Sequence, residues 1–349
     1  MKKTNQYISL LLAVLMTVGL SSCIKEDYAV SSDETATVNL MFTTRADLNQ
    51  DGVDEDARIH EGIKTLRVIL VQNGKVIVNH KAKGLDKGDA PVLSQTITFW
   101  QIPKAQSTFY AVANEESVEG LGNKLAAYTP ESDFNTLDDQ ELRGEIIRVQ
   151  TGTIPGAADD IATNGLPIAG IYSEDLSNVE DGHILRIPIT RAVAKFVLYI
   201  NNESGEAFNL NSVNLGTFVA DRTYLFPGQN RLPQGVTYNE KKMYSLNANT
   251  TVAANDDGKG EPAFIGYIYE TGTRDADDFT LSLTSSTPGF KDLAKAVPIQ
   301  FDEAGRNYIN RNDLVEIRAT VNIHKEVETD LDILVVPWGE KDIEVPPFN

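Results

Sequence analysis

The chain has 349 residues, of which 41% are hydrophobic and 8% aromatic. That length suggests two domains of about 100–200 residues each, and the composition supports hydrophobic cores, which excludes disordered, collagen-like and coiled-coil proteins. The 50 acidic residues outnumber the 31 basic ones, giving a formal net charge of -19, and because nucleic-acid binding relies on Lys and Arg, no nucleic-acid partner is expected.

The first residues have the layout of a secretory signal. Two lysines precede an apolar run over 8–20, which is too short to span a bilayer comfortably. Cys23, the only cysteine, follows Leu20-Ser21-Ser22, where a bacterial lipobox places its acylated cysteine. We predict a lipoprotein signal peptide over 1–22, lipid modification of Cys23 and a polar linker over 23–35. The alternative is an ordinary signal peptide with an incidental cysteine.

Short strands separated by turn residues fill the first half of the chain. In the first strand, over 37–42, alternation places Val38, Leu40 and Phe42 on one face. Two short helices are predicted over 117–128 and 135–143, and a long loop over 152–165. Further strands are predicted over 63–71, 76–78, 92–100, 108–113, 146–149, 168–172 and 184–189.

A second set of strands begins near residue 190, so we place the domain boundary near residue 187, between domains over 36–187 and 188–349. No long helices alternate with the strands, which favours an all-β fold of two antiparallel β-sandwich domains with a few short helices over a parallel α/β sheet. The strands of the second half are predicted over 190–200, 212–220, 243–246, 264–269, 279–284, 297–301, 314–323 and 331–336.

Catalytic signatures are missing from the sequence. The four histidines (His60, His80, His183 and His324) lie in separate segments without metal-ligand spacing. No nucleophile elbow, phosphate-binding loop or dinucleotide fingerprint occurs. We therefore expect neither an enzyme nor a cofactor.

One segment resembles part of a calcium loop. Asp47, Asn49 and Asp51 supply oxygen ligands at positions 1, 3 and 5, and a glycine follows at position 6. Position 12, where a glutamate should complete the coordination, is Arg58. A cation there repels calcium, so the prediction is an acidic loop without metal, with these three residues as the alternative calcium ligands.

Several segments together resemble the type V pilins, or fimbrillins, of Bacteroidia. Lys25-Glu26-Asp27 is similar to the signal that sends lipoproteins of this group to the outer face of the outer membrane. The other matching segments are the lipobox ending at Cys23, the first strand with Arg45-Ala46, Ile63 to Leu66, Leu166 to Gly170, Ile189 to Lys195, and Asn307 to Trp338.

The resemblance implies two transthyretin-like β-sandwich domains in tandem and assembly by strand exchange. In this family a lipidated precursor reaches the cell surface, and an arginine-specific protease cuts after the first strand. The C-terminal segment of another subunit then fills the vacated groove. Arg45 and Ala46 match the cleavage site; the alternative is that Arg45 is a solvated loop arginine.

The C-terminal residues are the candidate donor strand. Ile343, Val345 and Phe348 alternate with polar residues or prolines, whereas the segment over 331–336 could be either a donor or the last strand of its own domain. We expect a polymerising fimbrial subunit that supports adhesion, with other fimbrial subunits as partners. A non-polymerising anchor or tip subunit and a monomeric glycan-binding lipoprotein are the alternatives, but Trp100 and Trp338 lie in strand contexts that predict core packing.

Overall fold

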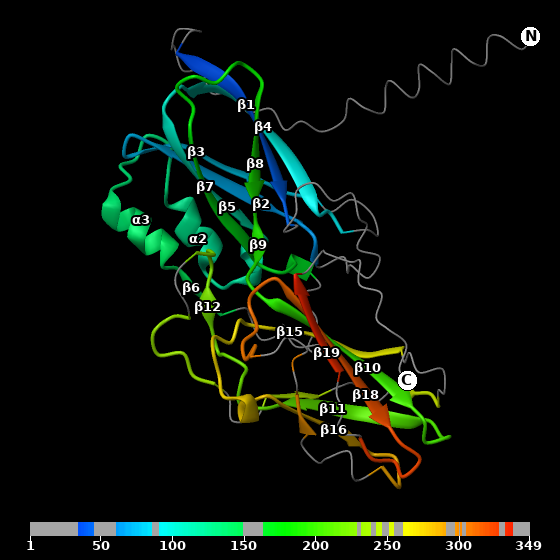
Figure 1. The fold of residues 1–349 in the computed structure, drawn as a ribbon. Helices are drawn as coiled ribbons and strands as arrows, with labels where there is room; N and C mark the ends of the chain where they lie inside the picture. Colours follow the sequence, from blue (N-terminus) through cyan, green and yellow to red (C-terminus); the bar gives the residue numbers. More distant parts are fainter. Residues whose placement is uncertain are drawn as a thin grey trace, which may run out of the picture.

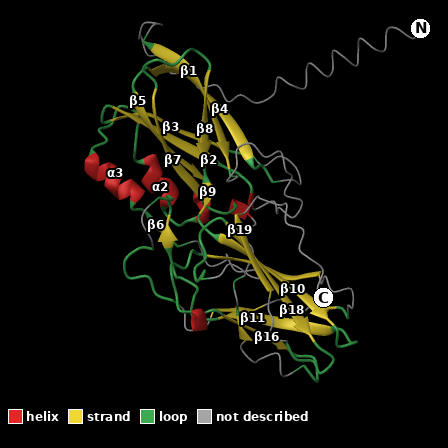
Figure 2. Ribbon diagram, in the orientation of Figure 1, coloured by secondary structure: helices red, strands yellow, loops and turns green. Residues whose placement is uncertain are grey.

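Figure 1 shows a computed structural model of the chain, which consists mainly of β-strands with a few short helices (Figure 2). Among the residues that the structure describes, no helix is long and apolar enough to cross a membrane. The residues that the structure describes are 34–44, 61–85, 91–148, 163–228, 232–238, 242–245, 251–254, 261–290, 297–299, 301, 305–327 and 332–337.

Two sheets face each other in the first half of the chain. One has the strand order β4 (Ser94–Pro103), β1 (Thr35–Thr43) and β8 (His183–Pro188). The other has the order β3 (Lys75–Ala82), β2 (Leu66–Gln72), β5 (Gln106–Ala113), β7 (Ile168–Asp175) and β9 (Thr190–Arg191). Leu40 of the first sheet and Leu70 and Phe109 of the second belong to one buried cluster, so the two sheets form a sandwich.

Short helices cover the other face of the five-stranded sheet. They are the 3-10 helix η2 (Glu115–Ser117), α2 (Leu121–Ala126) and α3 (Thr136–Arg143). The Asn135 side chain accepts hydrogen bonds from the amides of Leu137 and Asp138 and so caps α3. The helix predicted over 117–128 is shorter than expected, because Gly120 adopts a left-handed φ of 75° directly before α2.

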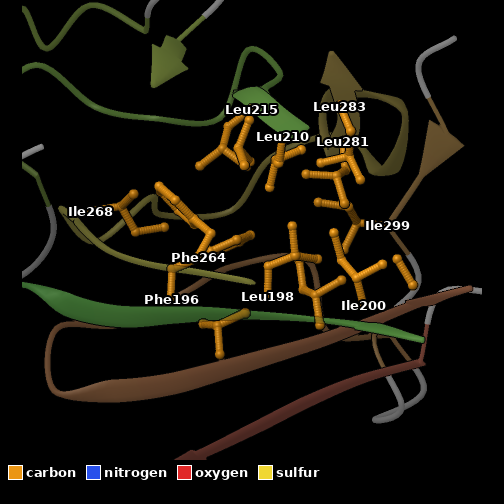
Figure 3. Packing of buried hydrophobic residues seen from close by; sticks show 14 of the residues in the cluster. Phe196, Leu198, Ile200, Leu210, Leu215, Phe264, Ile268, Leu281, Leu283 and Ile299 are labelled. Carbon is orange, nitrogen blue, oxygen red and sulfur yellow. The ribbon is translucent and has the colours of Figure 1, made fainter. Parts of the chain in front are cut away.

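Two further sheets enclose the core of the second half (Figure 3). Phe196 and Leu198 lie in one sheet and Leu210 and Leu281 in the other, and all four are buried in the same cluster. The first has the order β15 (Glu261–Ile268), β10 (Ala194–Asn202), β18 (Asp313–Val321) and β19 (Asp332–Pro337). The second has the order β13 (Lys242–Ser245), β11 (Phe208–Leu215), β16 (Thr280–Ser285) and β17 (Val297–Pro298), with β14 (Thr251–Val252) paired to β11; η3 (Ala276–Asp278) precedes β16.

The all-β prediction is confirmed, but the strand pairing is not antiparallel throughout. β1 pairs in parallel with β8, and β10 pairs in parallel with β18. Parallel neighbours need a long crossover, and in each case the two strands are separated by many residues that build other strands. Local strand patterns cannot reveal such a long-range pairing.

The two halves of the chain are joined by packing as well as by the backbone. β6 (Ile146–Ile147) pairs with β12 (Thr223–Tyr224), a strand that the sequence did not predict. Phe226 lies edge-on to Tyr110, with the ring centroids 6.0 Å apart. The predicted boundary near residue 187 stays a prediction, and most of the loop predicted over 152–165 lies outside the described residues.

Gly170 of β7 lies against the chain that leaves β8. A Cβ atom there would be 2.3 Å from the carbonyl oxygen of Pro188, a backbone atom that cannot move away cheaply. We expect Gly170→Ala to lower the free energy of unfolding by about 1–3 kcal/mol, because overpacking forces the backbone to shift. Urea unfolding measures this change, and an unchanged midpoint would contradict the close approach.

Candidate functional site

β1 is the central strand of its sheet and lies between β4 and β8 (Figure 1). Leu40 lies opposite Ile97 of antiparallel β4 and Leu185 of parallel β8. β1 is therefore hydrogen-bonded along both edges, although it comes from the beginning of the chain and β8 is more than 140 residues away in sequence. Removing β1 would leave a gap between two strands rather than a shortened edge.

The inward side chains of β1 are core residues. Val38, Leu40 and Phe42 are each 0% exposed, as the alternation in the sequence predicts. Burying each of them contributes about 1.5–3 kcal/mol relative to leaving it in water. A sheet without β1 would therefore expose apolar pockets together with unpaired backbone groups on β4 and β8.

The outward side of β1 is held by polar contacts. Thr98 Oγ1 of β4 donates a hydrogen bond to Asn39 Oδ1 (2.7 Å), and Asn39 Nδ2 donates one to the carbonyl oxygen of Gly182 (3.0 Å). The Thr37 amide donates to Asp181 Oδ1 (2.6 Å), and the Gly182 amide donates to the Thr37 carbonyl (2.9 Å). We call Thr98, Asp181 and Gly182 the outer clasp.

The charge of the outer clasp comes from one carboxylate. Hydrogen bonds from Thr37 lower the pKa of Asp181, so this group carries its negative charge at neutral pH. It lies at the turn that leads into β8, beside the start of β1. Lys104 also lowers this pKa, so its positive charge offsets part of the negative charge of Asp181 at this end of β1.

Two buried residues, Thr44 after β1 and Glu61 before β2, are held by the same arginine. Thr44, which is 1% exposed, donates its amide hydrogen to Leu93 O (3.0 Å). Glu61 is 0% exposed. Arg191 contacts both residues, donating to Glu61 O (3.3 Å) and Thr44 Oγ1 (3.5 Å). Arg191 thus links the end of β1 to the residues that precede β2.

Glu61 is fixed by residues of the second half of the chain. Lys195 Nζ of β10 lies 3.0 Å from Glu61 Oε1, and Tyr267 Oη of β15 donates a hydrogen bond of 2.7 Å to the same oxygen. The side chains of Glu61 and Lys195 are 0% and 3% exposed. An ion pair so far from solvent is costly to break, because either charge left alone stays buried.

The remaining site residues predicted from the sequence lie outside the described residues, so the predictions about them stay predictions. They are Cys23, Arg45, Ala46, the alternative calcium ligands Asp47, Asn49 and Asp51, and the donor residues Ile343, Val345 and Phe348. Within the described part of the chain, no three His, Cys, Asp or Glu residues are grouped so that they could hold a metal ion.

The prediction that Trp100 packs in the core is wrong, since its side chain is 47% exposed. Trp100 alternates with buried Phe99 and so shares the outer face with Thr98. A register irregularity lies opposite it, between Ala36 and Val38, and the following Gln101 has a φ of 56°. One objection to the glycan-binding alternative, the lack of an exposed tryptophan, is therefore removed; Trp338 lies outside the described residues.

Sequence reasoning missed the outer clasp and the Glu61 ion pair. The alternation in β1 could have placed Asn39 on the outer face, but not opposite Thr98 or within hydrogen-bond distance of Gly182, because both come from distant segments. Likewise, an acidic residue two positions before an apolar run carries no sign of its buried lysine partner.

Comparison with solved structures identifies relatives of this fold. The tip fimbrial protein Mfa3 of Porphyromonas gingivalis, solved with a C-terminal truncation, superposes with a TM-score of 0.58 at 15% identity, covering 86% of this chain and 100% of that one. The chain has the fold of a fimbrial protein. A cell adhesion protein of Parabacteroides distasonis, described as putative, matches with a TM-score of 0.52 at 13% identity, over 87% of this chain and 97% of that one.

The resemblance to fimbrillins that the sequence suggested is confirmed at the level of the fold. No protein-family model matches the chain, and no curated protein matches it. The chain thus shares its fold with these proteins. At 15% and 13% identity, the roles of individual residues do not carry over from them to this chain.

Proposed function

We propose that the chain is a cell-surface fimbrial subunit whose first strand is removed by proteolysis and replaced by a strand of another subunit. The observation that carries this proposal is the position of β1, which is paired on both edges and buries three fully enclosed apolar side chains. Its loss leaves a groove of the kind that an added strand fills. The similarity of the fold to fimbrial and adhesion proteins supports the same role.

The precursor, in this proposal, is tethered to the outer membrane through Cys23. We expect a fatty-acid analogue fed to cells to label the wild-type protein and not Cys23→Ser, because this is the only thiol in the chain. Fluorescence of the immunoprecipitated protein measures the label. Equal labelling of both proteins would contradict lipid attachment at this residue.

An arginine-specific protease cuts between Arg45 and Ala46 in this account. In the sequence this peptide bond comes shortly after β1 and opens a polar stretch rich in Asp, Asn and Gly, the kind of segment that proteases cut. We expect Arg45→Ala to stay full-length and monomeric, whereas the wild type gives SDS-resistant oligomers. Immunoblots of boiled and unboiled samples distinguish the two.

Arg58→Ala is the matched control for this cut, since Arg58 lies in the same segment between Thr44 and Glu61. It should process normally. If Arg45→Ala still formed oligomers, the cut would lie at another residue. If the wild type were never cut, the result would favour a non-polymerising anchor subunit that keeps its first strand.

A further inference from the structure

The strand between β4 and β8 meets two different surfaces. Its inward side fills apolar pockets, whereas on its outward side Asn39 receives a hydrogen bond from Thr98 and donates one to Gly182 O. The asparagine side chain therefore uses both its carbonyl and its amide group. This double contact is specific to a side chain that both accepts and donates.

We call the space between β4 and β8 that β1 occupies the groove. Its apolar side discriminates poorly between one strand sequence and another. Because side chains alternate with a period of two, any strand with apolar residues at every second position can present them inward, and a shift of two residues keeps the same face inward. The outer clasp adds a second requirement. The residue that lies between the Val38 and Leu40 sites must both accept a hydrogen bond from Thr98 and donate one to Gly182 O.

A carboxylate does not meet this requirement. An ionised glutamate accepts hydrogen bonds but cannot donate one to Gly182 O. It would also lie near Asp181, whose carboxylate is held at the start of β1 by the Thr37 amide. Two negative charges close together and a carbonyl oxygen without its donor both disfavour binding.

The chain's own candidate donor strand carries a glutamate at this position. If Ile343 and Val345 occupy the Val38 and Leu40 sites, in either strand direction, Glu344 takes the place of Asn39. Both inward residues of this segment are apolar, but the residue between them is a carboxylate, which the outer clasp disfavours.

We infer that the outer clasp selects a strand of a different fimbrial subunit, one with an amide side chain at the Asn39 position, over the chain's own segment Ile343 to Val345. This inference rests on the proposed strand exchange and goes beyond it, because it names which strand fits. It makes Thr98 and Asp181 specificity-determining residues and predicts mixed rather than self assembly at this groove.

Peptide binding to the full chain cut at Arg45 tests the inference. The labelled probes are the peptide over 34–44, its Asn39→Glu and Met41→Glu variants, and the peptide over 340–349 with and without Glu344→Asn. Met41→Glu is the matched control, since Met41 also points outward and lies beside Arg186. We expect Asn39→Glu to weaken binding by at least about tenfold and Met41→Glu by less than about threefold.

Replacing Glu344 with asparagine should strengthen binding of the 340–349 peptide by at least about tenfold, the counterpart of the loss in the Asn39→Glu peptide. An unchanged 340–349 peptide that binds as tightly as the 34–44 peptide would overturn the inference. Equal binding of the 34–44 peptide and its Asn39→Glu variant would overturn it as well.

The intact chain provides a second, independent test. Asn39→Glu should lower the melting temperature by roughly 3 °C or more, Met41→Glu should not, and Asp181→Asn should recover part of the loss in the Asn39→Glu background. If no peptide enters the cut chain, strand exchange itself is wrong, and the intact-chain variants still decide whether the outer clasp rejects a carboxylate. A melting temperature of Asn39→Glu equal to that of Met41→Glu would refute the clasp.

Discussion

Lys195→Met is expected to lower the free energy of unfolding by about 3–5 kcal/mol, because it leaves the Glu61 carboxylate buried without its cation. Lys195 Nζ and Glu61 Oε1 are 3.0 Å apart, and both side chains are almost completely shielded from solvent. Tyr267 would still donate to the carboxylate, but one hydroxyl does not replace a full positive charge. Urea unfolding followed by circular dichroism measures the change.

The matched control is the double variant Glu61→Gln with Lys195→Met. It removes both charges and keeps an amide that Tyr267 can contact, so it should be clearly more stable than Lys195→Met alone. A loss below about 1 kcal/mol in Lys195→Met would show that the charges are not buried as a pair.

Phe42→Ala is expected to destabilise the uncut precursor by about 3–5 kcal/mol, the usual cost of truncating a fully buried phenylalanine. Phe42 is 0% exposed in the cluster that joins the two sheets of the first sandwich. Met41→Ala, at the neighbouring outward position that is 37% exposed, should cost less than about 1 kcal/mol. Both variants are made in the Arg45→Ala background, so that neither is cut. Thermal or urea unfolding then measures the two losses of stability.

The same Phe42→Ala change should have no effect on the stability of assembled subunits. Once β1 has been replaced, the mutated residue is no longer part of the molecule. Dissociation of purified oligomers by heat in SDS measures this second effect. Oligomers of Phe42→Ala that fall apart at a lower temperature than wild-type oligomers would show that β1 stays in the groove.

Much of the fold follows from the sequence because it depends on local pattern. Alternation in β1 gives the buried row of Val38, Leu40 and Phe42, and the Asn135 cap marks the start of α3. The prediction of antiparallel sandwiches holds for most strand pairs, but β1 pairs in parallel with β8, and a local pattern cannot show a pairing between strands so far apart in sequence.

The candidate site around β1 also has one part that the sequence predicts and one part that it does not. Its apolar side is visible in the sequence, whereas its polar side is not, because Thr98 and Gly182 reach Asn39 only after distant segments have folded. The position of Trp100 shows the limit of residue type as a guide: its strand was predicted, yet alternation with buried Phe99 puts the indole outside.

The mass and N-terminal sequence of the subunit purified from assembled surface fibres test the central claim most directly. The account predicts a chain that begins at Ala46, without lipid and without any residue of β1. A fibre-borne chain that still begins at Cys23 and retains Val38, Leu40 and Phe42 would contradict replacement of the first strand.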